Sequence, residues 1–374
     1  MGQSRFDRDA LTSDIASAAK LAILRRRKSQ ENKCRLSWGV ARRLGGLMKI
    51  FAISEPKPSE KWRKRFHESW PRYRDWYLSQ GEDARPSLET ARMAIRQHMP
   101  ELLPLYDRVC TIVQPDTLAQ RALSLFKTPP VIAGCSVAIA PTETPTLVRN
   151  YDLRPDFFEG TVLQSHWLEQ DVIATSEGWI GCLDGVNSDG LAVALTFGGR
   201  LAHGESGFQT PLLLRYILET CSTTTQAIQT LKRLPVQMVS NVVILDKSGD
   251  HAVTYLSPDR EMAFRRVPIA TNHQLALEWP EGNQWSETAI RADHLAKIRA
   301  ENIELSSFIA EFHQKPLYRT AYDEGLGTLY TVVIKPEAQM VEYHWPNQSR
   351  WIQSMSAFAE GERELPVYEL LQKS

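Results

Sequence analysis

A change of hydrophobic period near Pro130 constrains the fold of this chain more than any other feature of its sequence. Between residues 56 and 126 apolar side chains recur every three or four positions, which predicts helices. Beyond Pro130 the period falls to two, and residues 135–153 predict a β-hairpin. After it we expect more strands, two helices, further strands, a helical stretch, a last hairpin and a C-terminal helix. This order indicates an α+β fold, in which helices are layered on antiparallel sheets.

The first helical stretch carries aromatic residues along one face. They lie three or four positions apart: Trp62, Phe66, Trp70, Tyr73 and Trp76. That spacing puts all five on one side of a helix. Such a stripe is far more typical of a protein core than of a ligand site, so we predict that these residues pack inside the protein.

The composition is that of an ordinary globular protein. The 374 residues are 43% apolar and 24% charged, and the net charge is zero. A neutral chain gives no support for nucleic acid or a membrane as the main partner. No apolar run approaches the roughly 20 residues that a membrane-spanning helix needs. The five cysteines are scattered and show no zinc spacing, so we expect reduced thiols in a cytoplasmic protein without metal or cofactor.

The first 47 residues differ from the rest, with eleven Lys and Arg against four Asp and Glu. Three interpretations remain open for this segment. It is a basic arm that contacts nucleic acid or membrane, a poorly ordered extension, or an over-long start that precedes a true initiator at Met48.

Gly134 and Cys135 stand at the head of the predicted hairpin. A cysteine in a strand is usually a small buried hydrophobe, and that interpretation holds for Cys135 taken alone. Its neighbours favour a different one. Gly134 leaves its own carbonyl open to attack, and Arg149 and Asp152 lie on the second strand, where they can face the start of the first. An ordinary surface ion pair between Arg149 and Asp152 is the alternative.

These residues support one mechanism. The Cys135 thiol attacks the Gly134 carbonyl and cuts the bond between the two residues, which leaves Cys135 with a free α-amine. An α-amine has a pKa of about 7.7–8.0, so it can accept the thiol proton near neutral pH without help from a histidine. Asn272, a short amide after an apolar strand, is a candidate donor to an oxyanion.

On these residues the chain resembles N-terminal nucleophile hydrolases of the penicillin acyltransferase (isopenicillin N acyltransferase) type, which are related to choloylglycine hydrolases. The resemblance covers roughly Met48 to the C-terminus. It rests on Gly134-Cys135-Ser136, Arg149-Asn150-Tyr151-Asp152, residues 185–199, Thr271-Asn272-His273, a helix start at 286–291 and Thr328-Leu329-Tyr330-Thr331. It implies a four-layer αββα sandwich of antiparallel sheets with a helical N-terminal segment, and self-cleavage before Cys135.

The resemblance also implies roles for single residues. Cys135 would be the nucleophile with its α-amine as base, Asp152 would hold that amine, Arg149 would balance charge, Asn272 would stabilise the oxyanion, and Arg291 would be a second arginine of the site. One position departs from the pattern. Related bile-acid enzymes carry an asparagine where this chain has Thr196, so a backbone N–H would replace that second oxyanion donor.

We therefore predict an autoprocessed amidohydrolase that cuts a linear amide through an acyl-cysteine intermediate, with a small-molecule acyl amide or acyl thioester as substrate. Two alternatives remain open: an acyl-CoA-dependent acyltransferase with the same nucleophile, and a non-catalytic relative that only binds a partner. The expected organisation is a basic extension at 1–47, a mostly helical segment at 48–134 and a catalytic segment at 135–374, the last two packing as one domain.

Four further residues could belong to the site, but the sequence favours another interpretation for each. Cys182 is expected in the core and Asn187 in a turn. His203 and Glu205 fit a solvated loop better than a substrate lid.

Overall fold

The computed structural model describes residues 47–202, 204, 206–322 and 325–366. Residues 49–363 form one compact unit. Residues 1–46 of the basic segment predicted at 1–47 lie outside the described residues, as do His203 and Glu205, so the predictions made for them stay predictions. Within the described ranges, no helix combines the length and the apolar character needed to cross a bilayer.

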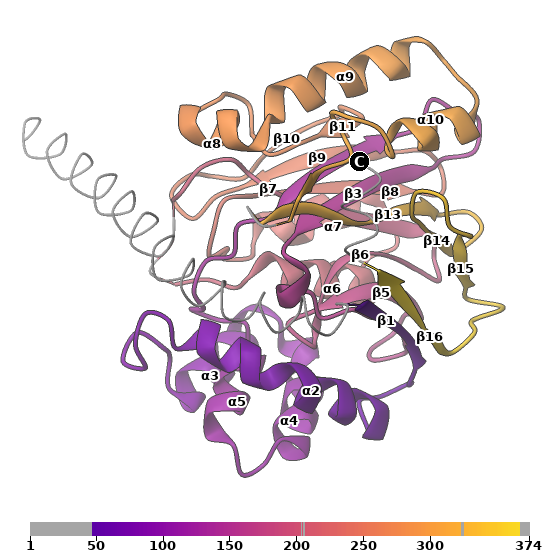
Figure 1. Ribbon diagram of the computed structural model, residues 1–374. Coiled ribbons are helices and arrows are strands. Elements are labelled where there is room, and N and C mark those ends of the chain that lie inside the picture. The colour runs from indigo at the N-terminus through magenta and orange to yellow at the C-terminus, as the bar shows by residue number, and fades with distance from the viewer. Residues whose placement is uncertain (1–46, 203, 205, 323–324, 367–374) are drawn as a thin grey trace, which may run out of the picture. The chain divides into compact units, whose positions relative to one another are not determined.

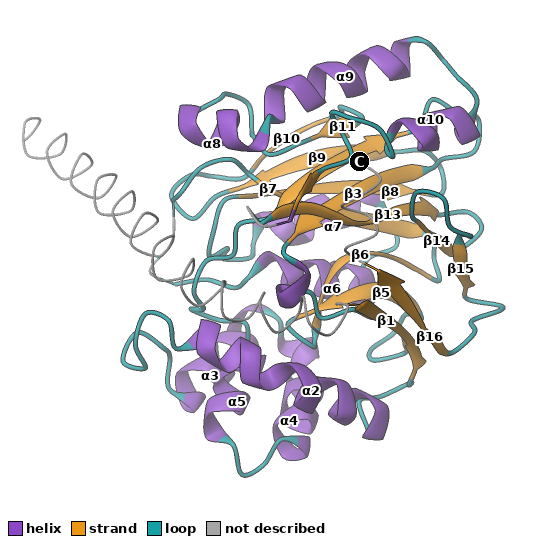
Figure 2. Cartoon of the chain, in the orientation of Figure 1, coloured by secondary structure: helices purple, strands orange, loops and turns teal. Residues whose placement is uncertain are grey.

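Two sheets form the centre of the molecule (Figure 2). The larger one contains nine strands, in the spatial order β10 (Ala263–Arg265), β9 (His251–Leu256), β8 (Ser240–Asp246), β7 (Leu191–Phe197), β6 (Gly181–Asn187), β5 (Val172–Glu177), β4 (Thr161–Ser165), β1 (Leu47–Ser54) and β16 (Gly361–Pro366). The smaller one contains seven, with β12 (Thr320–Ala321) beside β13 and the others in the order β11 (Ile269–Ala270), β2 (Gly134–Ile139), β3 (Leu147–Leu153), β13 (Leu326–Lys335), β14 (Met340–His344) and β15 (Trp351–Ser354). Strand β1 runs parallel to β4, whereas the hairpin neighbours are antiparallel.

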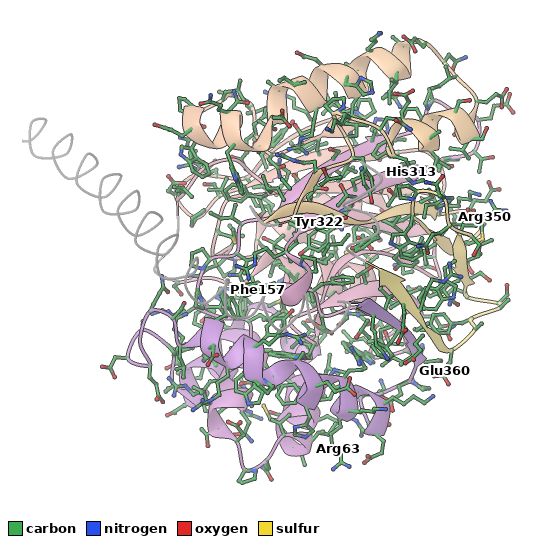
Figure 3. All side chains as sticks on the ribbon, in the orientation of Figure 1. Arg63, Phe157, His313, Tyr322, Arg350 and Glu360 are labelled. Carbon is green, nitrogen blue, oxygen red and sulfur yellow. The ribbon has the colours of Figure 1, made fainter. Side chains whose placement is uncertain are left out.

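Helices cover both outer faces of the paired sheets (Figure 1). On one side lie α8 (Pro280–Ser286), α9 (Thr288–Ala300) and α10 (Leu305–Glu311), where Leu295 and Phe312 pack on Ala138 and Val148 of the smaller sheet. On the other side α6 (Thr210–Thr220) and α7 (Thr224–Lys232) contact the larger sheet. Side chains fill the layer between the sheets (Figure 3). The predicted αββα sandwich is thus confirmed.

The N-terminal segment is helical, as predicted, and its helices gather beside the larger sheet (Figure 1). They are α2 (Glu60–Tyr77), α3 (Leu88–His98), α4 (Leu103–Ile112) and α5 (Thr117–Leu123). The aromatic face of α2 packs around Trp179, whose ring centroid lies 4.9 Å from that of Phe66 and 4.5 Å from that of Tyr73. The core prediction is confirmed for four of the five aromatic residues. Trp76 is only partly buried.

Strands β2 and β3 form the predicted hairpin, with Gly134 opposite Asp152. Side chains alternate along a strand, so β2 has two faces. Ala138 packs against Leu295 of α9, and we call the side that carries Gly134 and Ala138 the helix face. The side that carries Cys135 turns toward the larger sheet, and we call it the cavity face for the cavity described below.

One prediction of secondary structure was wrong, and one strand was missed. The chain forms β15 and β16, and no C-terminal helix, in the described part after residue 350. The N-terminal strand β1 was not predicted. All three strands lie at or near a sheet edge, where pairing depends on backbone hydrogen bonds and leaves a weak pattern in the side chains.

Candidate active site

The Cys135 thiol is buried at the start of β2 on its cavity face. Its Sγ lies 3.4 Å from Nη2 of Arg149. Burial raises the pKa of the Cys135 thiol, and the positive charge of Arg149 opposes that rise. The thiol of the intact chain therefore remains protonated near neutral pH and needs a base before it can act as a nucleophile.

Arg149 reaches the thiol from β3, and its guanidinium is fixed by hydrogen bonds to three other residues. Its guanidinium donates to a carboxylate oxygen of Asp184, to the Tyr330 hydroxyl at 3.0 Å and to the Leu195 carbonyl at 3.1 Å. Arg149 and Asp184 are both fully buried. The alternative of a surface pair between Arg149 and Asp152 is wrong, because Arg149 pairs with Asp184 inside the protein.

Asn272 lies against the backbone of Cys135, just after the short strand β11 that pairs with β2. Its Oδ1 accepts from the Cys135 backbone N–H at 3.0 Å and from Nη2 of Arg291 at 2.6 Å. Its Nδ2 donates to the carbonyls of Phe197 at 3.2 Å and Ala133 at 3.4 Å. Two donors on one side and two acceptors on the other fix the orientation of the amide.

Arg291 comes from the first turn of α9 and is fully buried. Its Nη1 donates to the Cys135 carbonyl and to Oγ of Ser136 at 2.9 Å, and its Nε donates to the Ser286 carbonyl at 2.9 Å. Burial lowers the pKa of Arg291 to about 10, although Asp152 opposes the shift. The structure thus brings the predicted second arginine to the backbone of the predicted nucleophile.

Asp152 occupies the helix face directly opposite Gly134. A Cβ atom at position 134 would come within 2.9 Å of Asp152 Oδ2, so a glycine is required there. The Thr328 hydroxyl donates to Oδ1 at 2.8 Å, whereas Oδ2 is buried without a hydrogen-bond partner among the described residues. Burial raises the pKa of Asp152, and the positive charges of Arg291 and Arg319 oppose the rise.

Thr196 supports the segment that carries Asn272. Its hydroxyl donates to the Thr271 carbonyl at 2.9 Å and accepts from Asn241 at 3.0 Å. A hydroxyl used in this way positions Asn272 and is not free to donate to an oxyanion.

A cavity of about 670 Å³, which includes its opening to solvent, lies beside Cys135 and Arg149. Most of its wall is apolar and comprises Leu125, Leu183, Leu195, Phe197 and Met238, among others. Tyr73 and Trp76 of α2 also line it. The segment that precedes Cys135 in the sequence therefore builds part of the wall of the cavity that the thiol faces.

Sequence reasoning missed several residues of this region. Asp184 and Glu177 were not predicted, and Tyr330 was named only as part of the motif at 328–331. Asp184 stands two positions after Cys182 in a buried strand, where an isolated carboxylate is unusual. Cys182 lies in the core and Asn187 holds the turn after β6 through a bond from the Leu191 N–H at 2.9 Å, as predicted. In the described part of the chain no group of three His, Cys, Asp or Glu residues is placed to hold a metal ion.

The family model described as acyl-coenzyme A:6-aminopenicillanic acid acyl-transferase matches residues 140–350, which is more than half of the chain. The chain belongs to this family. The match includes Arg149, Asp152, Asn272 and Arg291, while Cys135 lies five residues before it. The resemblance seen in the sequence is thereby confirmed, as is the prediction of an enzyme of the amide hydrolase and acyltransferase class.

The chain is also similar to several solved structures. Penicillin V acylase from Agrobacterium tumefaciens is 13% identical, with a TM-score of 0.39 over 62% of this chain and 91% of its own. A mutant of conjugated bile acid hydrolase from Clostridium perfringens is 12% identical, with a TM-score of 0.42 over 62% and 96%. The Caenorhabditis elegans ortholog of N-acylethanolamine-hydrolyzing acid amidase is 16% identical, with a TM-score of 0.40 over 59% and 99%. No curated protein matches by sequence.

Proposed function

We propose that the chain cuts itself between Gly134 and Cys135 and then acts as an amidohydrolase with the N-terminal Cys135 as nucleophile. One observation carries the proposal. Asn272 and Arg291 bind the backbone N–H and C=O of Cys135 on one side of the residue, while its thiol meets Arg149 and an apolar cavity on the other. A cysteine with only a structural role would require neither the fixed backbone nor a thiol that faces an arginine and a cavity.

Self-cleavage begins with attack of Sγ of Cys135 on the carbonyl carbon of Gly134. A C–S bond forms, the C–N bond of the peptide breaks, and the thiol proton passes to the leaving nitrogen. Water then hydrolyses the thioester, which leaves a carboxylate on Gly134 and a free thiol. The absence of a side chain on Gly134 and its tight fit against Asp152 support this step, because both keep the carbonyl accessible and fixed.

Cleavage converts the Cys135 amide nitrogen into an α-amine without moving it from its partners. Asn272 Oδ1 already accepts from this nitrogen, and the unpartnered Oδ2 of Asp152 is available to hold an ammonium. An α-amine with a pKa of about 7.7–8.0 can take the proton of the thiol. The base and the nucleophile then belong to one residue, so their geometry is set covalently.

The acyl amide binds in the cavity with its carbonyl next to the thiol. Asn272 Nδ2 holds the Ala133 carbonyl in the intact chain, and departure of residues 133–134 after cleavage frees this donor for the oxyanion. The thiolate attacks, the amine product leaves with a proton from the α-ammonium of Cys135, and water hydrolyses the acyl-cysteine.

An acyltransferase is the second candidate, and the description of the matching family favours it. The same acyl-cysteine would form from an acyl thioester, and an amine would replace water as the acceptor. The residues are the same in both reactions, so the difference lies in which acceptor reaches the intermediate first.

The test compares Cys135→Ala with Cys182→Ala, a second buried cysteine that lies in the core. Each purified variant is assayed for autocleavage and for turnover of a panel of N-acyl amides and acyl thioesters, with and without added amines, and acyl adducts are located by peptide mass spectrometry. We expect Cys135→Ala to fold, remain one chain and lose all turnover, while Cys182→Ala keeps it. If Cys135→Ala keeps its activity and Cys182→Ala loses it, Cys135 is not the nucleophile.

A further inference from the structure

Two residues that line the cavity, Glu177 and Trp76, each have one polar atom that is buried without a hydrogen-bond partner in the described part of the chain: Glu177 Oε2 and Trp76 Nε1. Two other polar side chains of the wall are hydrogen-bonded. Gln209 donates to Thr128 at 2.7 Å, and Thr210 donates to Ser240 at 2.9 Å. An unpaired polar atom in a buried site has a free-energy cost unless a ligand or water pairs with it.

Trp76 and Glu177 lie in the same part of the cavity wall, because Tyr73 contacts both residues. The Tyr73 hydroxyl donates to Oε1 of Glu177 at 2.6 Å, and the Tyr73 and Trp76 rings meet edge to face with centroids 6.1 Å apart. Oε1 is thereby occupied and fixed, which leaves Oε2 as the free side of the carboxyl group. Burial raises the pKa of Glu177 to about 8, with the negative charge of Glu159 adding to the shift.

The chemistry of the two atoms defines what can satisfy both. The indole Nε1–H of Trp76 only donates, so it needs an acceptor. Glu177 Oε2 accepts when the carboxyl is ionised and also donates when it is protonated. A hydroxyl group can accept from the indole and still donate to, or accept from, the carboxyl in either state.

We propose that this part of the cavity recognises a hydroxyl group on an otherwise apolar acyl chain, bound between Trp76 Nε1 and Glu177 Oε2. The inference rests on the proposed function, because it takes the cavity beside Cys135 to be the acyl site. Trp76 precedes the proposed cleavage point and Glu177 follows it. The N-terminal fragment must therefore stay bound after cleavage for the acyl group to be recognised.

Binding to the uncut Cys135→Ala chain tests this without requiring turnover. The probes are N-methylamides in three matched pairs: hexanoyl and 6-hydroxyhexanoyl, octanoyl and 8-hydroxyoctanoyl, phenylacetyl and 4-hydroxyphenylacetyl. Calorimetric titration should give at least one pair in which the hydroxylated member binds about 10-fold tighter, since the site rejects an analogue that leaves its buried polar atoms unpaired. Equal or weaker binding of the hydroxylated member in all three pairs would overturn the inference.

Substitutions assign the preference to its residues. Trp76→Phe keeps an aromatic ring but removes the N–H, and Glu177→Leu removes the carboxyl group, so each should reduce the preference to about 2-fold or less. Glu169→Leu, at an exposed position outside the cavity wall, is the matched control and should keep it. A preference that survives Trp76→Phe contradicts the inference even if Glu177→Leu does not fold. If the hydroxylated probes show no preference, the proposed reaction is unaffected. If neither self-cleavage nor acylation of Cys135 occurs, the proposed reaction itself is overturned.

Discussion

Two buried arginine–aspartate pairs flank Cys135, one on each face of β2, and they differ in how tightly they are made. On the cavity face Arg149 contacts Asp184 directly, and both oxygens of that carboxylate accept hydrogen bonds. On the helix face Nη1 of Arg291 lies 4.0 Å from Oδ2 of Asp152, and this oxygen has no hydrogen-bond partner in the described ranges.

The difference suggests that the carboxylates of Asp184 and Asp152 have different roles. Both oxygens of Asp184 already accept hydrogen bonds within the protein, so Asp184 fixes the guanidinium that touches the thiol. A carboxylate with a free buried oxygen is destabilised in the ionised form, as the raised pKa of Asp152 indicates. A new ammonium group beside it would remove that cost. We therefore interpret Asp184 as structural and Asp152 as the group reserved for the α-amine.

The largest expected effect comes from Asp184→Asn, compared with Asp152→Asn. Removing the charge of Asp184 leaves Arg149 buried and unpaired, which should reduce the free energy of unfolding by about 3–5 kcal/mol. Asp152→Asn should cost clearly less, because its pair is already loose. Both variants are measured by denaturant unfolding in the Cys135→Ala background, so that cleavage does not intervene. An equal or larger loss for Asp152→Asn would contradict this difference in roles.

The variant Asp152→Asn also tests the role of the helix face in catalysis. Asp152→Asn removes a negative neighbour from the α-amine, which lowers the pKa of the amine, so the acidic limb of the pH–rate profile should move to lower pH as well as lower height. The profile is measured on chains confirmed as cleaved. An unchanged acidic limb would show that Asp152 does not contact the amine.

The next effect concerns the oxyanion. Asn272→Ala should lower kcat on the order of 10²–10³-fold, about 3–4 kcal/mol, because the amide is a predicted donor to the charge that develops on the substrate carbonyl. KM should change much less, since that charge is absent in the bound substrate. Steady-state kinetics on the cleaved variant decide this. A kcat equal to that of the parent would remove Asn272 from the catalytic group and leave it as a binding partner of the Cys135 backbone.

The smallest expected effect concerns Glu177 in the cavity wall. The folded-state pKa of Glu177, about 8, is higher than the ordinary value of 4.5, so the folded chain binds more protons than the unfolded chain between these pH values. Stability should therefore fall as pH rises from about 4.5 to 8, by up to a few kcal/mol. Glu177→Gln, in the uncut Cys135→Ala background, should flatten this fall relative to the exposed control Glu169→Gln. Identical pH profiles for the two variants would show that Glu177 does not titrate in this range.

The sequence predicts the fold and the placement of Gly134 and Asp152 on one face of the hairpin, and the reasons are local. The hairpin at 135–153 follows from strict alternation, and with Gly134 opposite Asp152 the rest of that face follows from pairing. The spacing of Arg149 and Asp152 also excludes a direct pair between them. Residues three apart on a strand lie on opposite faces, so the two could never have formed one pair.

Beyond Cys135 and Arg149, the wall of the cavity could not be predicted from the sequence. Glu177 and Trp76 reach it from β5 and α2, Asp184 reaches Arg149 from β6, and their approach depends on how the sheets and the N-terminal helices pack. The aromatic spacing of α2 correctly predicts a buried face, but nothing in it distinguishes Trp76 at the cavity from Trp62 in the core. Edge strands such as β16 escape prediction for a related reason, because their place is fixed by a neighbouring backbone.

The central claim is that Cys135 becomes the N-terminus of the active enzyme, and the intact mass of the purified full-length chain, with N-terminal sequencing of each component, tests it most directly. We predict two fragments that copurify, the second of which begins with Cys135-Ser136-Val137, and a single uncut mass for Cys135→Ala. A wild-type chain that stays whole and still turns over an acyl amide would contradict the account.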